Sequence, residues 1–310
     1  MDYLDRLIQL AQVEGEINIL CRFQGNWQIK HQNEPSSLGI FHIISKGECR
    51  LILNNQQSYH LKPGDVFFLP HGLEHNIRSH HTADKSAVES ESNSSLTALK
   101  QLQHGPFTLR TNNQASHDFE MFCGYFRYSG HSTLPAILPE YWYLSGNNSS
   151  VTALLALLQK EALLEIGTAS VVNALCNVLF TYLTRDYIQQ NRDVSSGVLA
   201  ALQDKRLYHA VNSMLQNPEN GWNMENLAEL SAMSRANFIR LFKNKTGTLP
   251  GKFLTGLRMQ KAELLLRNSN KSILAVALEV GYQSEAHFSK AFKLKYGISP
   301  SKYRTHKLEE

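Results

Sequence analysis

The chain has 310 residues, of which 42% are hydrophobic, so it is long enough to build two domains with separate cores. It has a net charge of +4, four cysteines without a CxxC pair or a Cys/His zinc spacing, and no apolar run of the roughly 18 residues that a membrane span requires. These features argue against a disulfide framework, a structural zinc finger and a membrane protein. Residues 1–12 lack the basic start and apolar core of a signal peptide, and we therefore expect a cytoplasmic protein.

The charge is unevenly distributed along the chain. Residues 203–310 contain 17 Lys and Arg against 9 Asp and Glu, whereas residues 1–202 contain 14 against 18. A basic C-terminal segment after a mildly acidic one is typical of a phosphate-binding module that is attached to a domain with another task. A merely solvated basic surface would give the same counts, so charge alone does not decide between the two.

The N-terminal half is expected to begin with a short helix and to continue as a β-domain. Residues 3–12 place Leu4, Leu7, Ile8 and Ala11 on one helical face, and from Ile17 onward apolar residues alternate with polar ones. Further short runs with strand character lie at residues 27–30, 39–44, 49–53, 57–61 and 66–69. Many short strands in succession predict an all-β barrel or sandwich.

Two segments of this β-domain resemble the cupin motifs. Residues 60–77 contain two turns around a buried strand, and His75 follows the second turn as the histidine of the second cupin motif does. The segment FHIISKGECRL resembles the first motif, with His42 and Glu48 in place. It departs from that motif at Ile44, where an enzymatic cupin usually has another metal-binding histidine. The resemblance implies a cupin-like β-barrel.

His42, Glu48 and His75 are the candidate residues of an effector pocket inside this barrel. Three inward ligands could form a weak metal site, but two histidines in such places are also commonly hydrogen-bonded core residues. Because Ile44 replaces an expected ligand, the sequence assigns no metal, no cofactor and no catalytic residue.

The second part of the β-domain leads into two helices. Residues 82–103 are polar and without periodicity, which predicts a long surface loop, whereas strands are expected at 107–111 and 118–128. The second of these is apolar on nearly both faces, as in a strand between two layers. Residues 134–143, with two prolines, predict a packed connection.

The helices are expected at residues 150–166 and 168–190. In the second, Val172, Leu175, Leu179 and Tyr182 recur at three-four spacing. This spacing fits either a coiled-coil seam between two subunits or a helix buried on its own barrel. Residues 191–202, with Ser195-Ser196-Gly197, predict an interdomain linker.

The last hundred residues contain one pattern twice: a helix cap, an aromatic pair, a basic face, a glycine and a proline. The first copy has Ser234, Phe238, Phe242, Gly247 and Pro250, and the second has Ser284, Phe288, Phe292, Gly297 and Pro300. A helix and a turn precede each copy, and residues 250–267 predict one helix between them. Two helix-turn-helix units joined in this way would present two recognition helices to successive major grooves, roughly 34 Å apart.

The residues that we expect to contact DNA lie at the start of each recognition helix. They are Ser234, Arg235, Asn237 and Arg240 in the first unit, and Gln283, Ser284, Glu285, His287 and Lys290 in the second. Such polar and basic side chains are the ones that read base edges and phosphates.

This C-terminal stretch resembles the AraC/XylS transcription regulators, through VALEVGYQSEAHFSKAFKLKYGISPSKYR and the upstream WNMENLAELSAMSRANFIRLFKNKTGTLPGKF. The resemblance covers about the last hundred residues. It implies a seven-helix, double helix-turn-helix domain that binds double-stranded DNA and works with RNA polymerase. It also implies that the cupin-like domain is a sensor and that a helical hairpin after the barrel joins two subunits as a homodimer.

Two cysteines are candidates for a redox sensor. Cys21 shares the parity of Ile17 and Ile19 and should face the barrel interior, and Cys123 lies in the late apolar strand. Their places, together with Phe41-His42, residues 64–70 and Gly124, resemble the AraC-type subgroup that responds to reactive chlorine. The hypothesis needs a basic neighbour such as Arg22 or Arg127, and buried cysteines are also commonly inert. Cys49 and Cys176 are assigned to turn packing and helix packing.

The sequence therefore predicts an α+β protein of two domains, namely an N-terminal cupin-like β-barrel with a helical hairpin and a C-terminal all-α double helix-turn-helix domain. Residues 1–147 are assigned to the sensor domain, 148–190 to the dimerisation hairpin, 191–202 to the linker and 203–310 to DNA binding. The expected function is that of a sequence-specific transcription activator, not an enzyme, which responds to an oxidant or a small ligand.

Two other functions fit parts of the sequence. A metal-dependent cupin enzyme fused to a DNA-binding domain is one, and Ile44 argues against it. A purely architectural DNA-binding protein is the other, and it would not need the first two hundred residues.

Overall fold

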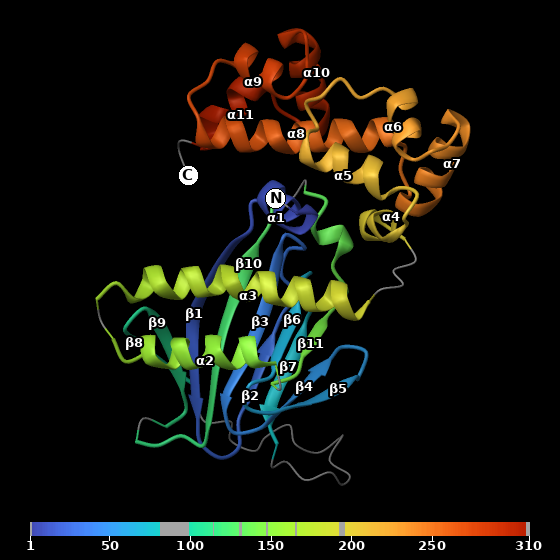
Figure 1. The fold of residues 1–310 in the computed structure, drawn as a ribbon. Helices are drawn as coiled ribbons and strands as arrows, with labels where there is room; N and C mark the ends of the chain where they lie inside the picture. Colours follow the sequence, from blue (N-terminus) through green and yellow to red (C-terminus); the bar gives the residue numbers. More distant parts are fainter. Residues whose placement is uncertain are drawn as a thin grey trace. The chain divides into compact units, whose positions relative to one another are not determined.

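The alternating segments of the N-terminal half form two β-sheets (Figure 1). The computed structural model describes residues 2–80, 99–113, 115–129, 132–146, 148–164, 166–191 and 196–307. The larger sheet has the strand order β11-β6-β3-β10-β1-β9-β8, and the smaller has β2-β7-β4-β5. The larger sheet contains β1 (Glu14–Phe23), β3 (Leu38–Lys46), β6 (Val66–Leu69), β8 (Lys100–His104), β9 (Phe107–Thr111), β10 (Phe119–Arg127) and β11 (Trp142–Leu144). The smaller contains β2 (Gln28–His31), β4 (Cys49–Leu53), β5 (Ser58–Leu61) and β7 (His75–Ser79).

The two sheets enclose one apolar core. In β4, Cys49, Leu51 and Leu53 are buried while the residues between them are partly exposed, as expected for a strand with one covered face. In β10, by contrast, nearly every residue is buried, because the larger sheet is covered on both faces. The core cluster joins residues of β1, β3, β6 and β10 to residues of β2, β4, β5 and β7.

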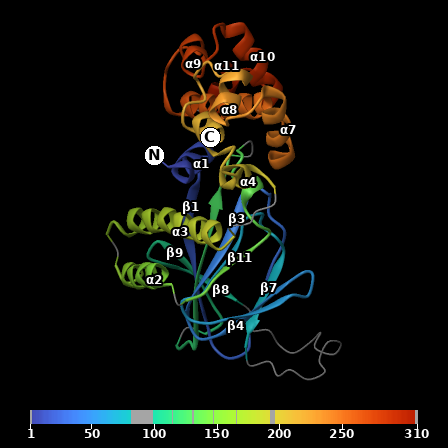
Figure 2. The same ribbon diagram turned by 45° about the vertical axis from the view of Figure 1, so that its right-hand side comes forward.

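Two helices cover the other face of the larger sheet, α2 (Ser149–Glu161) and α3 (Thr168–Gln190) (Figures 1 and 2). The ring of Phe180 in α3 lies 4.8 Å from that of Phe126 and 6.2 Å from that of Phe68, centroid to centroid. The layer order is therefore helices, larger sheet, core, smaller sheet. This arrangement confirms the expected strand between two layers.

The structure corrects several expected boundaries. Strand β8 occupies Lys100–His104, where the sequence predicted the end of a loop, and residues 82–98 of that loop lie outside the described residues. Strand β11 lies within and just beyond the expected connection at 134–143, and α2 ends at Glu161 rather than at residue 166. These segments are short, and their secondary structure depends more on contacts with the rest of the fold than on their own sequence pattern.

The C-terminal residues form helices. They are α4 (Val198–Gln203), α5 (Tyr208–Gln216), α6 (Met224–Leu230), α7 (Arg235–Thr246), α8 (Pro250–Asn268), α9 (Ile273–Glu279), α10 (Glu285–Tyr296) and α11 (Pro300–Lys307). The expected linker at 191–202 is wrong at its C-terminal end, because α4 begins at Val198 and buries its apolar residues. Residues 192–195 lie outside the described residues.

The chain divides into two compact units that do not follow the sequence order. One contains residues 13–128 and 138–189, and the other contains residues 1–12, 129–137 and 190–310. In the second unit, helix α1 (Tyr3–Ala11) contacts α5 and α8. Arg6 Nε donates to the Leu215 carbonyl at 3.0 Å, and Arg267 Nη1 donates to Gln12 Oε1 at 2.9 Å. The start of the chain, expected in the sensor domain, thus packs with the C-terminal helices.

Among the described residues, no helix combines the length and the apolarity that crossing a membrane requires.

Candidate functional site

The predicted repeat at the C-terminus forms two helix-turn-helix units, α6–α7 and α9–α10. The hydroxyl oxygens of Ser234 and Ser284 accept hydrogen bonds from the third backbone N–H that follows each, so both are N-caps as predicted. Helices α7 and α10 end at Gly247 and Gly297, which have left-handed φ angles of 74° and 79°. Helix α8 joins the two units.

The aromatic pair of each unit is its core. Phe238 and Phe242 of α7, and Phe288 and Phe292 of α10, are all fully buried. The turn before α10 needs a glycine, because Gly281 has a φ of 88° and an added Cβ would lie 2.4 Å from the Glu219 carbonyl oxygen. The buried aromatic pairs and Gly281 therefore fix the positions of the recognition helices from inside the domain.

The opposite faces of α7 and α10 are exposed. Arg235, Asn237 and Arg240 are exposed on α7, and so are Gln283, Glu285, His287 and Lys290 at the start of α10 or just before it. Two of them contact other polar groups: Arg240 Nη2 donates to Asn237 Oδ1 at 2.9 Å, and Arg235 Nε lies 3.3 Å from Glu225 Oε1. Because such exposed contacts are weak, these side chains remain available to a ligand.

A buried carboxylate connects these helices to a segment that is distant in the chain, and no sequence pattern indicated it. Glu263 of α8 is only 4% exposed. Its oxygens accept hydrogen bonds from Tyr303 at 2.6 Å, from Tyr296 at 2.9 Å and from Ser129 Oγ at 2.9 Å. Burial also lowers the pKa of Lys295 to about 8, and the charge of Glu263 partly offsets this.

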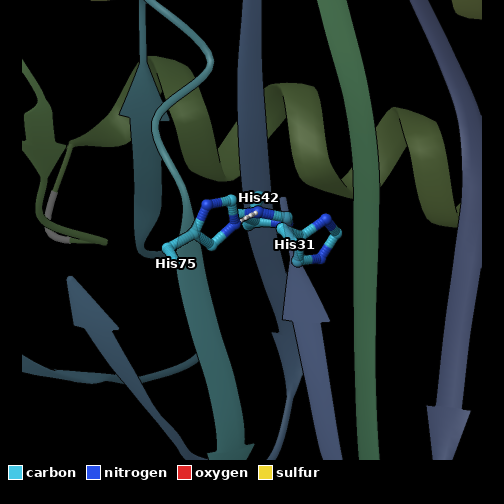
Figure 3. A group of neighbouring side chains, drawn as sticks. All are labelled: His31, His42 and His75. Carbon is cyan, nitrogen blue, oxygen red and sulfur yellow. Dashed lines mark hydrogen bonds between the residues drawn. The ribbon is translucent and has the colours of Figure 1, made fainter. Parts of the chain in front are cut away.

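A second polar cluster lies between the sheets of the other unit. His42 of β3 pairs with Cys123 of β10, and His31 of β2 pairs with His75 of β7. Figure 3 shows the three histidines. His42 Nε2 lies 2.8 Å from His75 Nε2, and His42 Nδ1 lies 3.1 Å from Cys123 Sγ. The ring of His31 stacks on that of His75 at 4.5 Å.

The hydrogen bonds of this cluster assign its protons. Burial lowers the pKa of His42 well below its usual range and lowers that of His75 as well, so both rings are neutral at pH 7. His75 Nδ1–H donates to the Leu73 carbonyl at 2.7 Å, which leaves His75 Nε2 as an acceptor. His42 Nε2–H must then donate to His75, and His42 Nδ1 must accept from the Cys123 thiol.

One of the three expected pocket residues lies elsewhere. Glu48 is exposed, and its carboxylate is 2.7 Å from His60 Nε2 on the surface. The alternation that buries Cys49 turns its neighbour Glu48 outward. His31, which the sequence did not single out, takes the third place beside His42 and His75.

The cysteines are closer together than the sequence indicated. The register pairs Ile19 with Cys123 and Cys21 with Met121, so the two cysteines are diagonal neighbours on adjacent strands. Burial is the larger cause that raises the pKa of the Cys123 thiol, and a hydrogen-bonding contact with Cys21 is the second cause. Cys49 is not in a turn but begins β4 in the same core cluster, and Cys176 is buried in α3 as expected.

The expected basic neighbours are not the ones found. Arg22 pairs with Glu120 at 2.7 Å, and Arg127 lies over the ring of Tyr125. Arg110 of β9 instead lines a cavity of about 180 Å³ together with His31, His42 and Cys123. The cavity therefore borders three members of the cluster and one basic residue.

Helix α3 presents two apolar stripes. Val172 and Leu179 are 1% and 0% exposed within a single chain, so the expected subunit seam through these residues is wrong. Val171 and Val178, one position earlier, are 41% and 39% exposed. With Leu175 and Tyr182, both partly exposed, they form the outer stripe.

The fold and these sites define a helix-turn-helix transcriptional regulator with a cupin domain. A family model described as a cupin matches residues 2–189, and one described as a helix-turn-helix domain matches residues 227–306. The chain belongs to the AraC-type transcription regulators with an N-terminal cupin domain.

Relatives that match nearly the whole chain are transcription regulators. An uncharacterized HTH-type transcriptional regulator of Haemophilus influenzae is 50% identical over 98% of both chains. The HTH-type transcriptional regulator MtrA of Neisseria gonorrhoeae is 37% identical, again over 98% of both. The RCS-specific HTH-type transcriptional activator RclR of Escherichia coli is 29% identical over 98% of this chain and 97% of its own.

Proposed function

We propose that this protein is a cytoplasmic, dimeric transcription activator that reads DNA through α7 and α10 and senses an oxidant at Cys123. The hydrogen bond between the Cys123 thiol and His42, beside a cavity of about 180 Å³ that both residues line, is the observation that carries the sensory part. By family resemblance, the activator works with RNA polymerase. The two exposed recognition helices support the DNA-reading part, together with the net charge of residues 203–310, in which Lys and Arg outnumber Asp and Glu by 17 to 9.

The base-reading residues should differ from the phosphate-binding ones in their effect on specificity. We expect Arg240→Ala to change the preference at one or two base pairs at a cost of about 1–3 kcal/mol, because a guanidinium in the major groove reads a base edge. Lys252→Ala, at the start of α8, should weaken binding to all sequences alike. Binding to a randomised operator pool measures the affinity and the base preference of both variants. If the two variants behaved alike, the assignment of Arg240 to base reading would be wrong.

The proposed oxidation needs only the thiol of Cys123, the thiol of a second cysteine and hypochlorous acid. The acid transfers chlorine to the sulfur of one cysteine and releases water, which gives a sulfenyl chloride. The sulfur of the second cysteine attacks the first, an S–S bond forms and HCl leaves. His42 Nδ1, at 3.1 Å from Cys123 Sγ, is placed to accept the proton that this thiol loses as its sulfur reacts. The name of RclR as an RCS-specific activator supports an oxidant of this kind.

Reporter induction by hypochlorous acid tests this proposal in strains with matched protein levels. Cys123→Ser should lower induction at least about tenfold, because the serine hydroxyl cannot be oxidised in this way. Cys21→Ser and Cys49→Ser identify the partner thiol, since both residues lie in the core cluster of Cys123. Cys176→Ser, buried in α3, is the matched control and should induce normally. Full induction of Cys123→Ser would leave a small ligand in the cavity as the better account.

The outer stripe of α3 is the proposed subunit interface. Val171, Leu175, Val178 and Tyr182 keep the three-four spacing of a coiled-coil seam and are exposed or partly exposed in the single chain. We expect Val178→Asp to convert a dimer into a folded monomer, because a carboxylate buried in an apolar seam costs several kcal/mol. Leu179→Asp should instead unfold the cupin unit. Sedimentation and circular dichroism separate the two results, and an unchanged mass for Val178→Asp would place the interface elsewhere.

A further inference from the structure

The three imidazoles between the sheets lie close to one another. One ring nitrogen of each of His31, His42 and His75 lies within 4.8 Å of the other two (Figure 3). A tetrahedral zinc site with bonds of 2.0–2.1 Å holds its nitrogens about 3.3 Å apart. The required shifts are therefore within the range of side-chain rotation and need no movement of the strands.

The hydrogen bonds around the rings fit metal ligands. The Leu73 carbonyl orients His75 through Nδ1, so that its Nε2 lone pair, which accepts from His42, points into the cluster. A hydrogen bond of this kind at the other ring nitrogen is the usual support of a metal-binding histidine. His31 Nε2 is buried and has no hydrogen-bond partner in the described parts of the chain. Burial of such an atom is costly unless something binds it, and a metal ion is one such partner.

Metal binding would change two contacts. The stack of His31 on His75, with ring planes 8° apart, cannot place one ion in both ring planes, so the His31 ring must turn. It is the ring best able to do so, because its Nε2 makes no hydrogen bond. His42 must move its proton from Nε2 to Nδ1, toward Cys123 Sγ, so that its Nε2 lone pair replaces the hydrogen bond to His75.

The fourth position would face the cavity. His31, His42 and Arg110 all line it. The guanidinium of Arg110 opposes a bare cation, but it favours an anion or hydroxide as the fourth ligand. Three protein ligands and one open position are the pattern of a zinc site that exchanges small ligands.

We propose that His31, His42 and His75 bind one divalent transition-metal ion of the class that imidazole prefers, such as Zn²⁺ or Co²⁺. The set differs from the two cupin motifs, because His31 comes from neither and Glu48 is absent from it. A second group, Glu48, His60 and His80, also has metal-ligand spacing but lies at the surface. His60 of this surface group therefore supplies the control variant.

The test uses the full-length protein after removal of metals by a chelator. Titration with Co²⁺, followed by visible absorption, should show one equivalent bound by the wild type. His31→Gln should bind at least about tenfold more weakly, since one of three ligands is lost. His60→Ala should bind as the wild type does. In thermal unfolding, Zn²⁺ should raise the midpoint of the wild type and of His60→Ala but not that of His31→Gln.

Three results would overturn the proposal. They are the absence of Co²⁺ binding by the wild type, a loss of binding in His60→Ala instead of His31→Gln, and a thiolate-to-cobalt absorption band, which would show that a cysteine sulfur is among the ligands. The spectrum of the wild type decides the last point even if a variant fails to fold. Circular dichroism of His31→Gln checks that its weaker binding does not come from unfolding.

Discussion

A fragment that begins at Gly197 is expected to be more stable than one that begins at Gln203, by at least about 3 kcal/mol. The two fragments differ in helix α4, whose Leu199 is 2% exposed and packs with its helix against α5 and α7. Removal of one large buried aliphatic side chain already costs about 2–5 kcal/mol, and α4 contributes Val198 and Leu202 as well. The domain boundary drawn from the sequence would cut off this helix.

Urea unfolding of both fragments measures the difference, and DNA binding gives a second measurement. The longer fragment should bind duplex DNA with an affinity that falls as salt rises, with a slope near −0.9 per neutralised phosphate. Equal unfolding midpoints would show that α4 does not stabilise the helix-turn-helix units.

Glu263→Ala should lower the free energy of unfolding of the full chain by about 2–6 kcal/mol. The carboxylate accepts hydrogen bonds from Ser129, Tyr296 and Tyr303. Its removal takes this acceptor from the Ser129 and Tyr303 hydroxyls, whereas Tyr296 keeps a hydrogen bond to the Met259 carbonyl at 3.1 Å. Each unsatisfied buried group costs about 1–3 kcal/mol. Glu263→Gln keeps an acceptor of the same shape and should lose less.

Glu229→Ala is the matched control, because Glu229 is exposed on a neighbouring helix and its loss should change the free energy of unfolding by less than about 0.5 kcal/mol. Chemical denaturation of the three variants compares them. If Glu263→Ala matched Glu229→Ala, the hydrogen bonds of Glu263 would have no net value for stability.

The C-terminal fold could be predicted because its signals are local. Ser234 and Ser284 as caps, and Gly247 and Gly297 as stops, act within one helix turn, and the repeat made chance agreement improbable. The buried aromatic pairs follow from helical spacing. The positions of each helix that are not needed for the core form its exposed face. For this reason the candidate DNA-contacting residues are all found at the surface or at a cap.

The sensory cluster could be predicted only in part, because it depends on pairing between distant strands. His42 and His75 came from motif resemblance, but no local pattern indicates that His31 lies opposite His75. Glu48 could have been excluded by the alternation in β4. In α3, both stripes have the same spacing, so periodicity could not tell the buried Leu179 from the exposed Val178.

The division of the chain has a consequence for how its two units are tethered. The polypeptide passes from one unit to the other at residues 12, 128, 137 and 189, so the linker near residue 191 is one of four connections. A single proteolytic cut there would not free the DNA-reading helices, because α1 would still hold them through Arg6 and Arg267. Strand β10, which carries Cys123, continues directly into Ser129 and thus into the hydrogen bonds of Glu263. The chain therefore links its two units at four places instead of through a single linker.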